Sequence, residues 1–230
     1  MHPTFRRLCV DVSGLGVAAL VLHSPCIAEE EPPRPSGPEL RLVWVDLAKV
    51  GTATTEDATL AVRDILAPAG LHVSGRTTAP GSSAPVEGAR VVLTDFAPNQ
   101  PVAGRLVGGE ARREGSRQPT VWIFPRAVAA ALGLDLARRH TWPPVSELLF
   151  ERALAAVVVH ELAHALAGAS HRPTGLMSPK LSRAGLLNPR LTLEADIRPA
   201  FLEGLARLQA GASDRSPADS RGPEAAAPTQ

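Results

Sequence analysis

Two histidines stand four residues apart, with a glutamate directly after the first, in the run HELAHALAGASHRPTGLM from His160 to Met177. On an α-helix this spacing places the rings of His160 and His164 on one face, one turn apart, where they can share a metal ion. Glu161 projects beside them, within reach of the proton of a metal-bound water. The run therefore predicts a metal centre built on a helix, and it constrains this chain more than any other feature.

The residues on both sides of this run support the prediction. Residues 146–160 contain neither Gly nor Pro and are rich in Leu and Val, as expected of a buried helix. Gly168 is expected to end that helix, because Gly readily adopts the left-handed backbone conformation. His171 follows three residues later and is placed to return toward the metal, and the segment Thr174–Met177 is typical of a tight turn that brings Met177 near the site.

The arrangement resembles the metzincin clan of zinc peptidases, whose pattern is H-E-x-x-H-x-x-G-x-x-H followed by a methionine turn. Here three residues, not two, separate His164 from Gly168, and in this the chain is similar to short secreted bacterial metzincin-like proteins. The resemblance implies a zinc-dependent endopeptidase that acts on a peptide or protein substrate. The site residues that it implies are the Zn²⁺ ligands His160, His164 and His171, the general base Glu161 and the structural methionine Met177.

Other interpretations of the same residues stay open. An H-E-x-x-H run also arises by chance on a solvated helix, and Met177 also suits an ordinary core position, because Met fills irregular gaps. A second hypothesis replaces His171 by a carboxylate third ligand, either Glu194 or Asp196, although both acids also suit the first turn of a helix. A third hypothesis is a catalytically inactive binding domain that keeps the fold.

The ends of the chain predict export and processing. Residues 1–28 have two arginines, an apolar run and a small-residue site ending at Ala28, which is typical of a secretory signal peptide. The expected location is therefore secreted or periplasmic in a bacterium, with no stable membrane insertion once the signal is removed. Residues 29–39 are expected to be a linker, residues 40–209 the catalytic domain, and residues 210–230 a disordered tail.

The order of elements predicts an α/β (α+β) fold. Strands are expected at residues 40–47, 71–76, 89–94, 102–107 and 120–124, and helices at 55–67 (capped by Thr55), 127–132 and 198–209, besides the metal helix. A strand, a helix and a strand in succession imply a parallel crossover. The metzincin resemblance implies a twisted mixed sheet of about five strands, a backing helix and a small C-terminal helical subdomain. It also implies an antiparallel edge strand at residues 103–109, for which a flexible loop is the alternative.

Charge and composition exclude some function classes. The chain has 24 basic and 23 acidic residues and 3% aromatic residues, so it lacks the basic surface with which nucleic-acid-binding proteins neutralise phosphates. It contains no Tyr, so the tyrosine that some metzincins turn toward their zinc has no counterpart here. The sequence gives no prediction of the oligomeric state.

Overall fold

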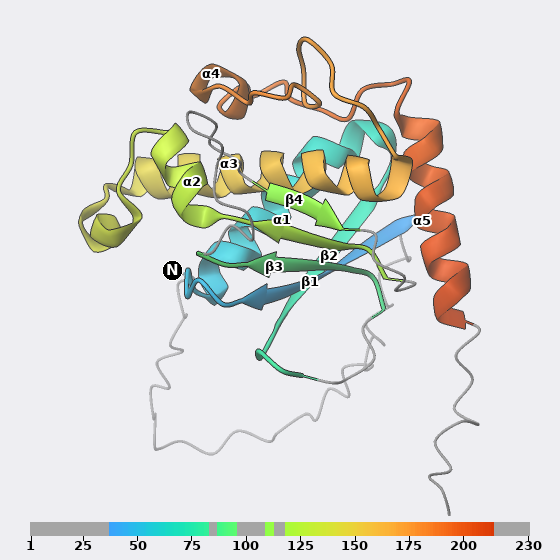
Figure 1. Cartoon of the computed structure of the whole chain (residues 1–230), viewed down its shortest axis with the longest axis horizontal. Helices are drawn as coiled ribbons and strands as arrows, with labels where there is room; N and C mark the ends of the chain where they lie inside the picture. Colours follow the sequence, from blue (N-terminus) through green and yellow to red (C-terminus); the bar gives the residue numbers. More distant parts are fainter. Residues whose placement is uncertain (1–36, 83–86, 96–108, 113–117, 214–230) are drawn as a thin grey trace, which may run out of the picture. The chain divides into compact units, whose positions relative to one another are not determined.

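A five-stranded sheet forms the centre of the fold in the computed structural model (Figure 1). The structure describes residues 37–82, 87–95, 109–112 and 118–213, which all belong to the compact unit Pro35–Gln230. The strands are β1 (Glu39–Asp46), β2 (His72–Thr78), β3 (Ala89–Leu93), β4 (Gly109–Arg112) and β5 (Thr120–Ile123), in the order β2-β1-β3-β5-β4. β1, β2, β3 and β5 run parallel, and β4 pairs antiparallel with β5. The mixed α/β class expected from the sequence is confirmed.

The strand at the β5 edge lies later in the chain than the sequence predicts. It was expected at residues 103–109, and the structure has it at Gly109–Arg112, while residues 96–108 lie outside the described part of the chain. Its sequence, GEAR, has no alternating apolar pattern, so periodicity could not locate it. The register of β4 against β5, which pairs Glu110 with Trp122, comes from backbone hydrogen bonding.

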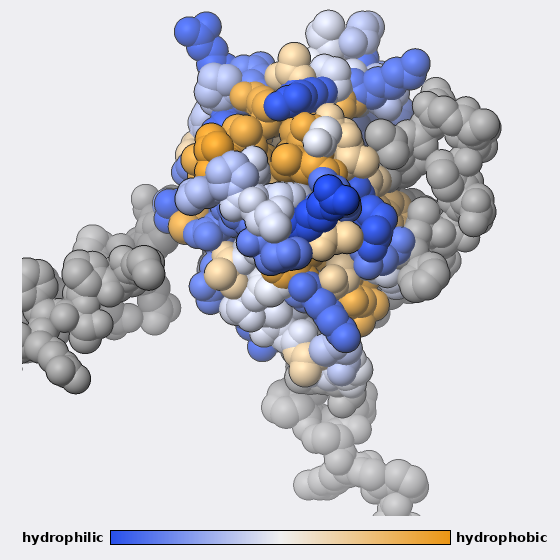
Figure 2. Space-filling model, turned by 90° about the vertical axis from the view of Figure 1, so that its left-hand side faces the viewer, coloured by the Kyte–Doolittle hydropathy of each residue, from blue (hydrophilic) through white to orange (hydrophobic). Residues whose placement is uncertain are grey.

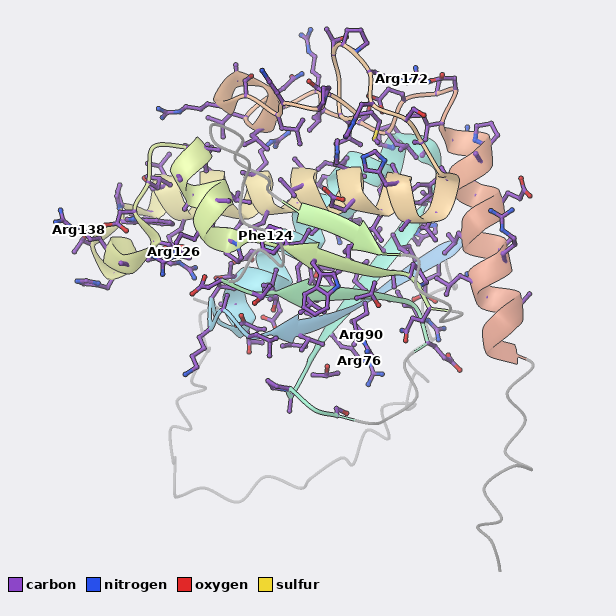
Figure 3. All side chains as sticks on the ribbon, viewed as in Figure 1. Arg76, Arg90, Phe124, Arg126, Arg138 and Arg172 are labelled. Atoms are coloured by element: carbon purple, nitrogen blue, oxygen red, sulfur yellow. The ribbon has the colours of Figure 1, made fainter. Side chains whose placement is uncertain are left out.

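One face of the sheet is apolar and packs under two helices, α1 (Thr52–Leu66) and α3 (Pro144–Leu162). On β1 this face carries Leu40, Leu42 and Trp44, each at most 1% exposed. The Trp44 indole Nε1–H donates to the Thr59 hydroxyl of α1 at 2.9 Å. The opposite face carries polar side chains such as Arg76 and Arg90, which point away from these helices (Figure 3). The main hydrophobic cluster of the described residues therefore lies on one side of the sheet, while the buried Val43 is on the other side, between Arg76 and Arg90.

The first helix begins earlier than predicted, and Thr55 is not its cap. α1 starts at Thr52, with Gly51 preceding it, and the Thr55 hydroxyl donates to the Thr52 carbonyl inside the first turn. The carboxylate of Asp46, at the end of β1, accepts the backbone N–H groups of Val50 and Gly51 at 3.1 and 2.8 Å. A side chain from the preceding strand thus holds the start of the helix, the role predicted for Thr55, which instead lies within the first turn.

The remaining helical segments lead to and from the long helix α3. They are α2 (Pro125–Ala131), the 3-10 turns η1 (Ala67–Ala69) and η2 (Leu136–Thr141), the π-turn η3 (Ala163–Ala167), α4 (Arg183–Leu186) and α5 (Arg198–Ser213). α3 begins at Pro144, a position that suits proline because the first-turn N–H has no partner in the helix. It packs against α1, β4 and β5. No helix in the described ranges is long and apolar enough to cross a membrane.

The domain boundaries differ slightly from the expected ones. Glu39 was assigned to the linker and is the first residue of β1. α5 continues to Ser213, so the first residues of the expected tail are helical. Residues 1–36 and 214–230 lie outside the described part of the chain, so the signal peptide and the rest of the tail stay predictions.

Arg139, in η2, ties this turn to the starts of α1 and α3. Its Nε–H donates to the Glu147 carboxylate at 2.8 Å, and its two Nη groups donate to the Val50 carbonyl and the Thr54 hydroxyl. The guanidinium also lies 5.5 Å from the centre of the Phe150 ring.

The surface on the side of the molecule that Figure 2 shows has apolar side chains between polar ones. Val145 and Leu148, at the start of α3, are the most exposed large apolar residues of the described chain.

Candidate metal centre

The C-terminal half of α3 carries His160 and Glu161, and the next turn carries His164. His160 and Glu161 are 6% and 7% exposed, and His164 is half-buried. Polar side chains are rarely buried to this extent without partners, because losing water costs free energy that only new bonds recover. Their burial in an otherwise apolar helix therefore points to a built site and excludes the solvated helix that the sequence left open.

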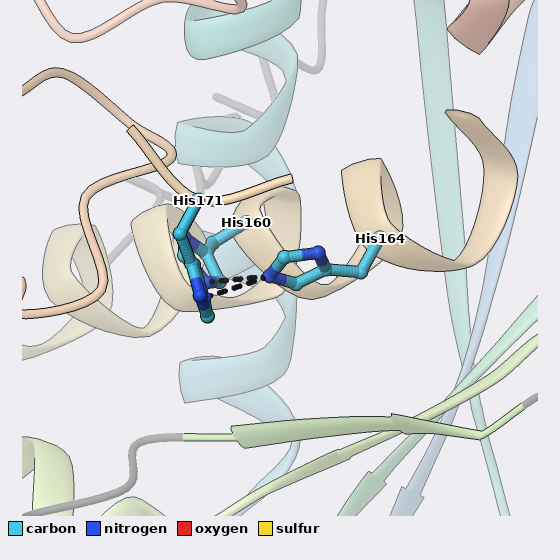
Figure 4. Close-up of side chains that lie close together, drawn as sticks. All are labelled: His160, His164 and His171. Carbon is cyan, nitrogen blue, oxygen red and sulfur yellow. Dashed lines mark hydrogen bonds between the residues drawn. The ribbon is translucent and has the colours of Figure 1, made fainter. Parts of the chain in front are cut away.

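The three predicted histidines come together (Figure 4). His164 Nε2 lies 3.1 Å from His160 Nε2 and 3.1 Å from His171 Nε2. Within the described residues, His160, His164 and His171 are the group whose ligand atoms could hold a metal ion. The exposed His171 arrives from the loop after Gly168, so the site opens to solvent on one side. Three ligands with one open side are the arrangement of a catalytic metal site, whereas structural sites are closed by four.

Backbone carbonyls fix the proton positions of the two helix histidines. His160 Nδ1 lies 2.7 Å from the Leu176 carbonyl oxygen, and His164 Nδ1 lies 2.6 Å from the Ala169 carbonyl oxygen. A carbonyl oxygen only accepts, so in both contacts the ring N–H donates. In a neutral imidazole the other nitrogen, Nε2, then carries a lone pair and no proton. Both Nε2 atoms are therefore available as metal ligands.

The distance between these two Nε2 atoms fits a shared metal ion. Two unprotonated ring nitrogens at 3.1 Å have no hydrogen between them, so their lone pairs repel each other. Two nitrogens bound to one tetrahedral zinc at 2.0–2.1 Å are separated by about 3.3 Å. The residues present thus fit a zinc ion in donor type, tautomer and spacing.

Burial also keeps these rings neutral. Loss of solvation, with a smaller contribution from the neighbouring rings of His164 and His171, lowers the pKa of His160 to about 4, although the hydrogen bond to the Leu176 carbonyl opposes this. Burial likewise lowers the pKa of His164, with a smaller contribution from His171. At pH 7 both rings are in the uncharged form that binds a metal.

The loop after His171 supplies the carbonyl that holds His160. The Arg172 N–H donates to the Met177 carbonyl at 2.9 Å, which closes the segment between them into a compact loop. Gly175 has φ 83°, a conformation that favours glycine. Leu176 and Met177 follow it and are both fully buried. The predicted tight turn is therefore present, and its backbone carbonyl at Leu176 contacts His160.

Glu194 and Asp196 hold this loop and do not join the histidine group. Glu194 Oε1 accepts the Met177 N–H at 3.2 Å, and the Asp196 carboxylate is paired with Arg172. Arg172 lies on the loop that passes above α3 in Figure 3. Both acids precede α5, which begins at Arg198. The interpretation that they lie in the first turn of that helix is therefore wrong.

Two features of α3 and its surroundings were not predicted from the sequence. The carbonyls of Leu176 and Ala169 orient the histidine rings, and every residue has a carbonyl, so only the fold identifies these two. Glu151, earlier on α3, is a buried acid: loss of solvation, with the nearby Asp57 and Glu147, raises its pKa to about 7. The apolar neighbours of Glu151 in α3 could have indicated its burial.

Comparisons with known proteins give little independent support. No protein-family model matches this chain, and no curated protein matches it. In structure the chain is similar to archaemetzincin from Methanopyrus kandleri, with 17% sequence identity and a TM-score of 0.46, over 75% of this chain and 99% of that chain. At this identity and TM-score the likeness does not establish a shared family. A functional assignment therefore depends on the geometry of the site.

Proposed function

We propose that this protein is a secreted zinc-dependent endopeptidase, with zinc bound by His160, His164 and His171. The observation that carries the proposal is the pair of unprotonated Nε2 atoms of His160 and His164, held 3.1 Å apart by backbone carbonyls that fix both tautomers. A bound zinc ion supplies a Lewis acid that polarises a carbonyl and lowers the pKa of water to about 7. The open side next to His171 leaves room for a substrate.

Glu161 is the proposed general base. It follows His160 directly in the sequence and is 7% exposed, so most of this residue is shielded from bulk water. In the proposed reaction it takes a proton from the attacking water and passes it to the departing amine. Glu194 and Asp196 are engaged with Met177 and Arg172, which disfavours a carboxylate third ligand.

The edge strand β4 is a proposed binding site for an extended peptide. β4 is last in the strand order, and none of the described strands pairs with its outer side. It contacts both α3 and the turn that carries His164 (Figure 1). An edge strand offers backbone N–H and C=O groups to which a peptide can add as a further strand. A substrate bound there would pass next to the histidines.

A Glu161→Gln substitution tests this function. The variant keeps all three histidines, so it should bind zinc with the wild-type stoichiometry, while cleavage of a quenched fluorescent peptide library should fall by about 100- to 10,000-fold. Glu203→Gln is the matched control, because Glu203 is an exposed acid on α5 that pairs with Arg207. Wild-type cleavage by the Glu161→Gln protein would reject the mechanism. A zinc-loaded wild-type protein that cleaves no library peptide would instead favour the inactive binding domain.

A further inference from the structure

The turn between the second histidine and Gly168 has an unusual hydrogen-bonding pattern. Residues Ala163–Ala167 form a π-turn, and the Gly168 N–H that closes it is shared between the carbonyl of Ala163, five residues back, and that of His164, four residues back at 3.1 Å. An α-helical turn closes over four residues, so a π-turn takes up one more residue in nearly the same axial distance. The three residues between His164 and Gly168 all lie in this wider turn.

Gly168 then ends the helix and reverses the chain toward the site. Its φ of 60° is left-handed, and a Cβ at this position would meet nothing within 4 Å, so glycine is favoured here by conformation and not by space. The next residue, Ala169, presents the carbonyl that accepts the His164 Nδ1–H, and His171 follows. Both the tautomer of His164 and the position of His171 therefore depend on where Gly168 falls.

The last helix, α5, packs against the π-turn. Gly204 of α5 lies so close to Leu166 that a Cβ at Gly204 would be 2.1 Å from the Leu166 carbonyl oxygen. Leu166 is 3% exposed and belongs to the main core. The π-turn is thus packed on its outer side by the backbone of another helix.

We propose that the π-turn is a positioning element that absorbs one residue between His164 and Gly168. It brings Gly168, the Ala169 carbonyl and His171 to the places that the metal site needs. The inference rests on the proposed metal centre but not on peptidase activity. It predicts that the number of residues between His164 and Gly168 can decrease by one without loss of the site. The number of residues between Gly168 and His171 cannot.

Two single-residue deletions test this directly, and each removes one alanine. Deleting Ala167 allows the turn to close as an α-turn, so zinc affinity should stay within about threefold of wild type, and the visible absorption bands of the Co²⁺ form should be unchanged. Deleting Ala169 leaves the Ser170 carbonyl next to Gly168 but brings His171 to the site one residue early, so the third histidine is misplaced and zinc affinity should fall on the order of 100-fold. Equal loss of affinity in both variants, or equal retention in both, would overturn the proposal.

Point substitutions at Gly168 provide a second test that leaves the chain length unchanged. Asn and Val have similar size, but Asn tolerates the left-handed conformation and the β-branched Val does not. Gly168→Asn should keep the Co²⁺ spectrum, and Gly168→Val should change it toward that of a two-histidine site. Identical spectra and zinc affinities for these two variants would contradict a role of this conformation in placing His171, even if the deletion variants do not fold.

The wild-type protein separates this inference from the proposed function. A wild-type protein that binds neither Zn²⁺ nor Co²⁺ would reject the metal centre itself and the inference with it. A wild-type protein that binds both ions, together with a folded Ala167 deletion that has lost them, would reject only the role of the π-turn.

Discussion

A Gly204→Ala substitution tests the packing of α5 against the π-turn that carries His164. The new Cβ would lie 2.1 Å from the oxygen, 2.7 Å from the carbonyl carbon and 3.0 Å from the Cα of Leu166. All three are backbone atoms, so no rotamer change can relieve the overlap. Either α5 or the π-turn must move by about 1 Å to restore van der Waals contact.

The expected cost exceeds the gain in helix propensity. Overpacking a rigid site costs about 1–3 kcal/mol or more, and a contact with backbone alone belongs at the upper end. Alanine gains about 0.5–1 kcal/mol over glycine within a helix. The net destabilisation should therefore be about 2 kcal/mol. In a domain of this size it lowers Tm by about 4–8 °C.

Thermal unfolding followed by circular dichroism measures this effect. Gly211→Ala is the matched control, because Gly211 lies on the same helix and its Cβ would meet nothing within 4 Å. That variant should be as stable as wild type or slightly more stable. If the Gly204→Ala protein melts at or above the wild-type temperature, α5 does not pack on Leu166 as described.

Two further predictions concern the buried acid Glu151 and the partly buried Arg139. Glu151→Gln should have little effect near pH 4 and should stabilise the protein by about 1–2 kcal/mol above pH 7 in urea unfolding. The reason is that burial raises the pKa of Glu151 to about 7 in the folded state, so wild type loses stability as pH rises from about 4.5 to 7. A constant difference across pH would contradict this. Arg139→Lys should lower the free energy of unfolding by about 1–3 kcal/mol at all these pH values. The reason is that one ammonium group cannot replace the hydrogen bonds of the guanidinium to Glu147, Val50 and Thr54 together. A variant as stable as wild type would refute this prediction.

The local part of the metal site could be predicted from the sequence, because helical spacing alone puts His160 and His164 on one face. The return of His171 could be expected from Gly168, whose left-handed conformation the structure contains. The π-turn could not be predicted, since a run of Ala and Leu gives the same pattern in either kind of turn. It depends on tertiary packing, in which Gly204 approaches from a distant part of the chain.

The wrong predictions about the fold have a similar cause, namely contacts between distant parts of the chain. Thr55 has the chemistry of a cap, but the Asp46 carboxylate holds the helix entry, and this contact crosses from strand to helix. The edge strand β4 has a polar sequence, so its position follows from pairing with β5 and not from side-chain pattern. The roles of Glu194 and Asp196 likewise depend on long-range contacts, with Met177 and Arg172.

Anomalous diffraction at the zinc absorption edge, from crystals of the zinc-loaded protein, tests the central claim most directly. We predict one strong peak, about 2.0–2.1 Å from the Nε2 atoms of His160, His164 and His171, with the Nδ1 contacts to Leu176 and Ala169 preserved. No peak at the three histidines, or a peak in which Glu194 or Asp196 takes the place of His171, would contradict it.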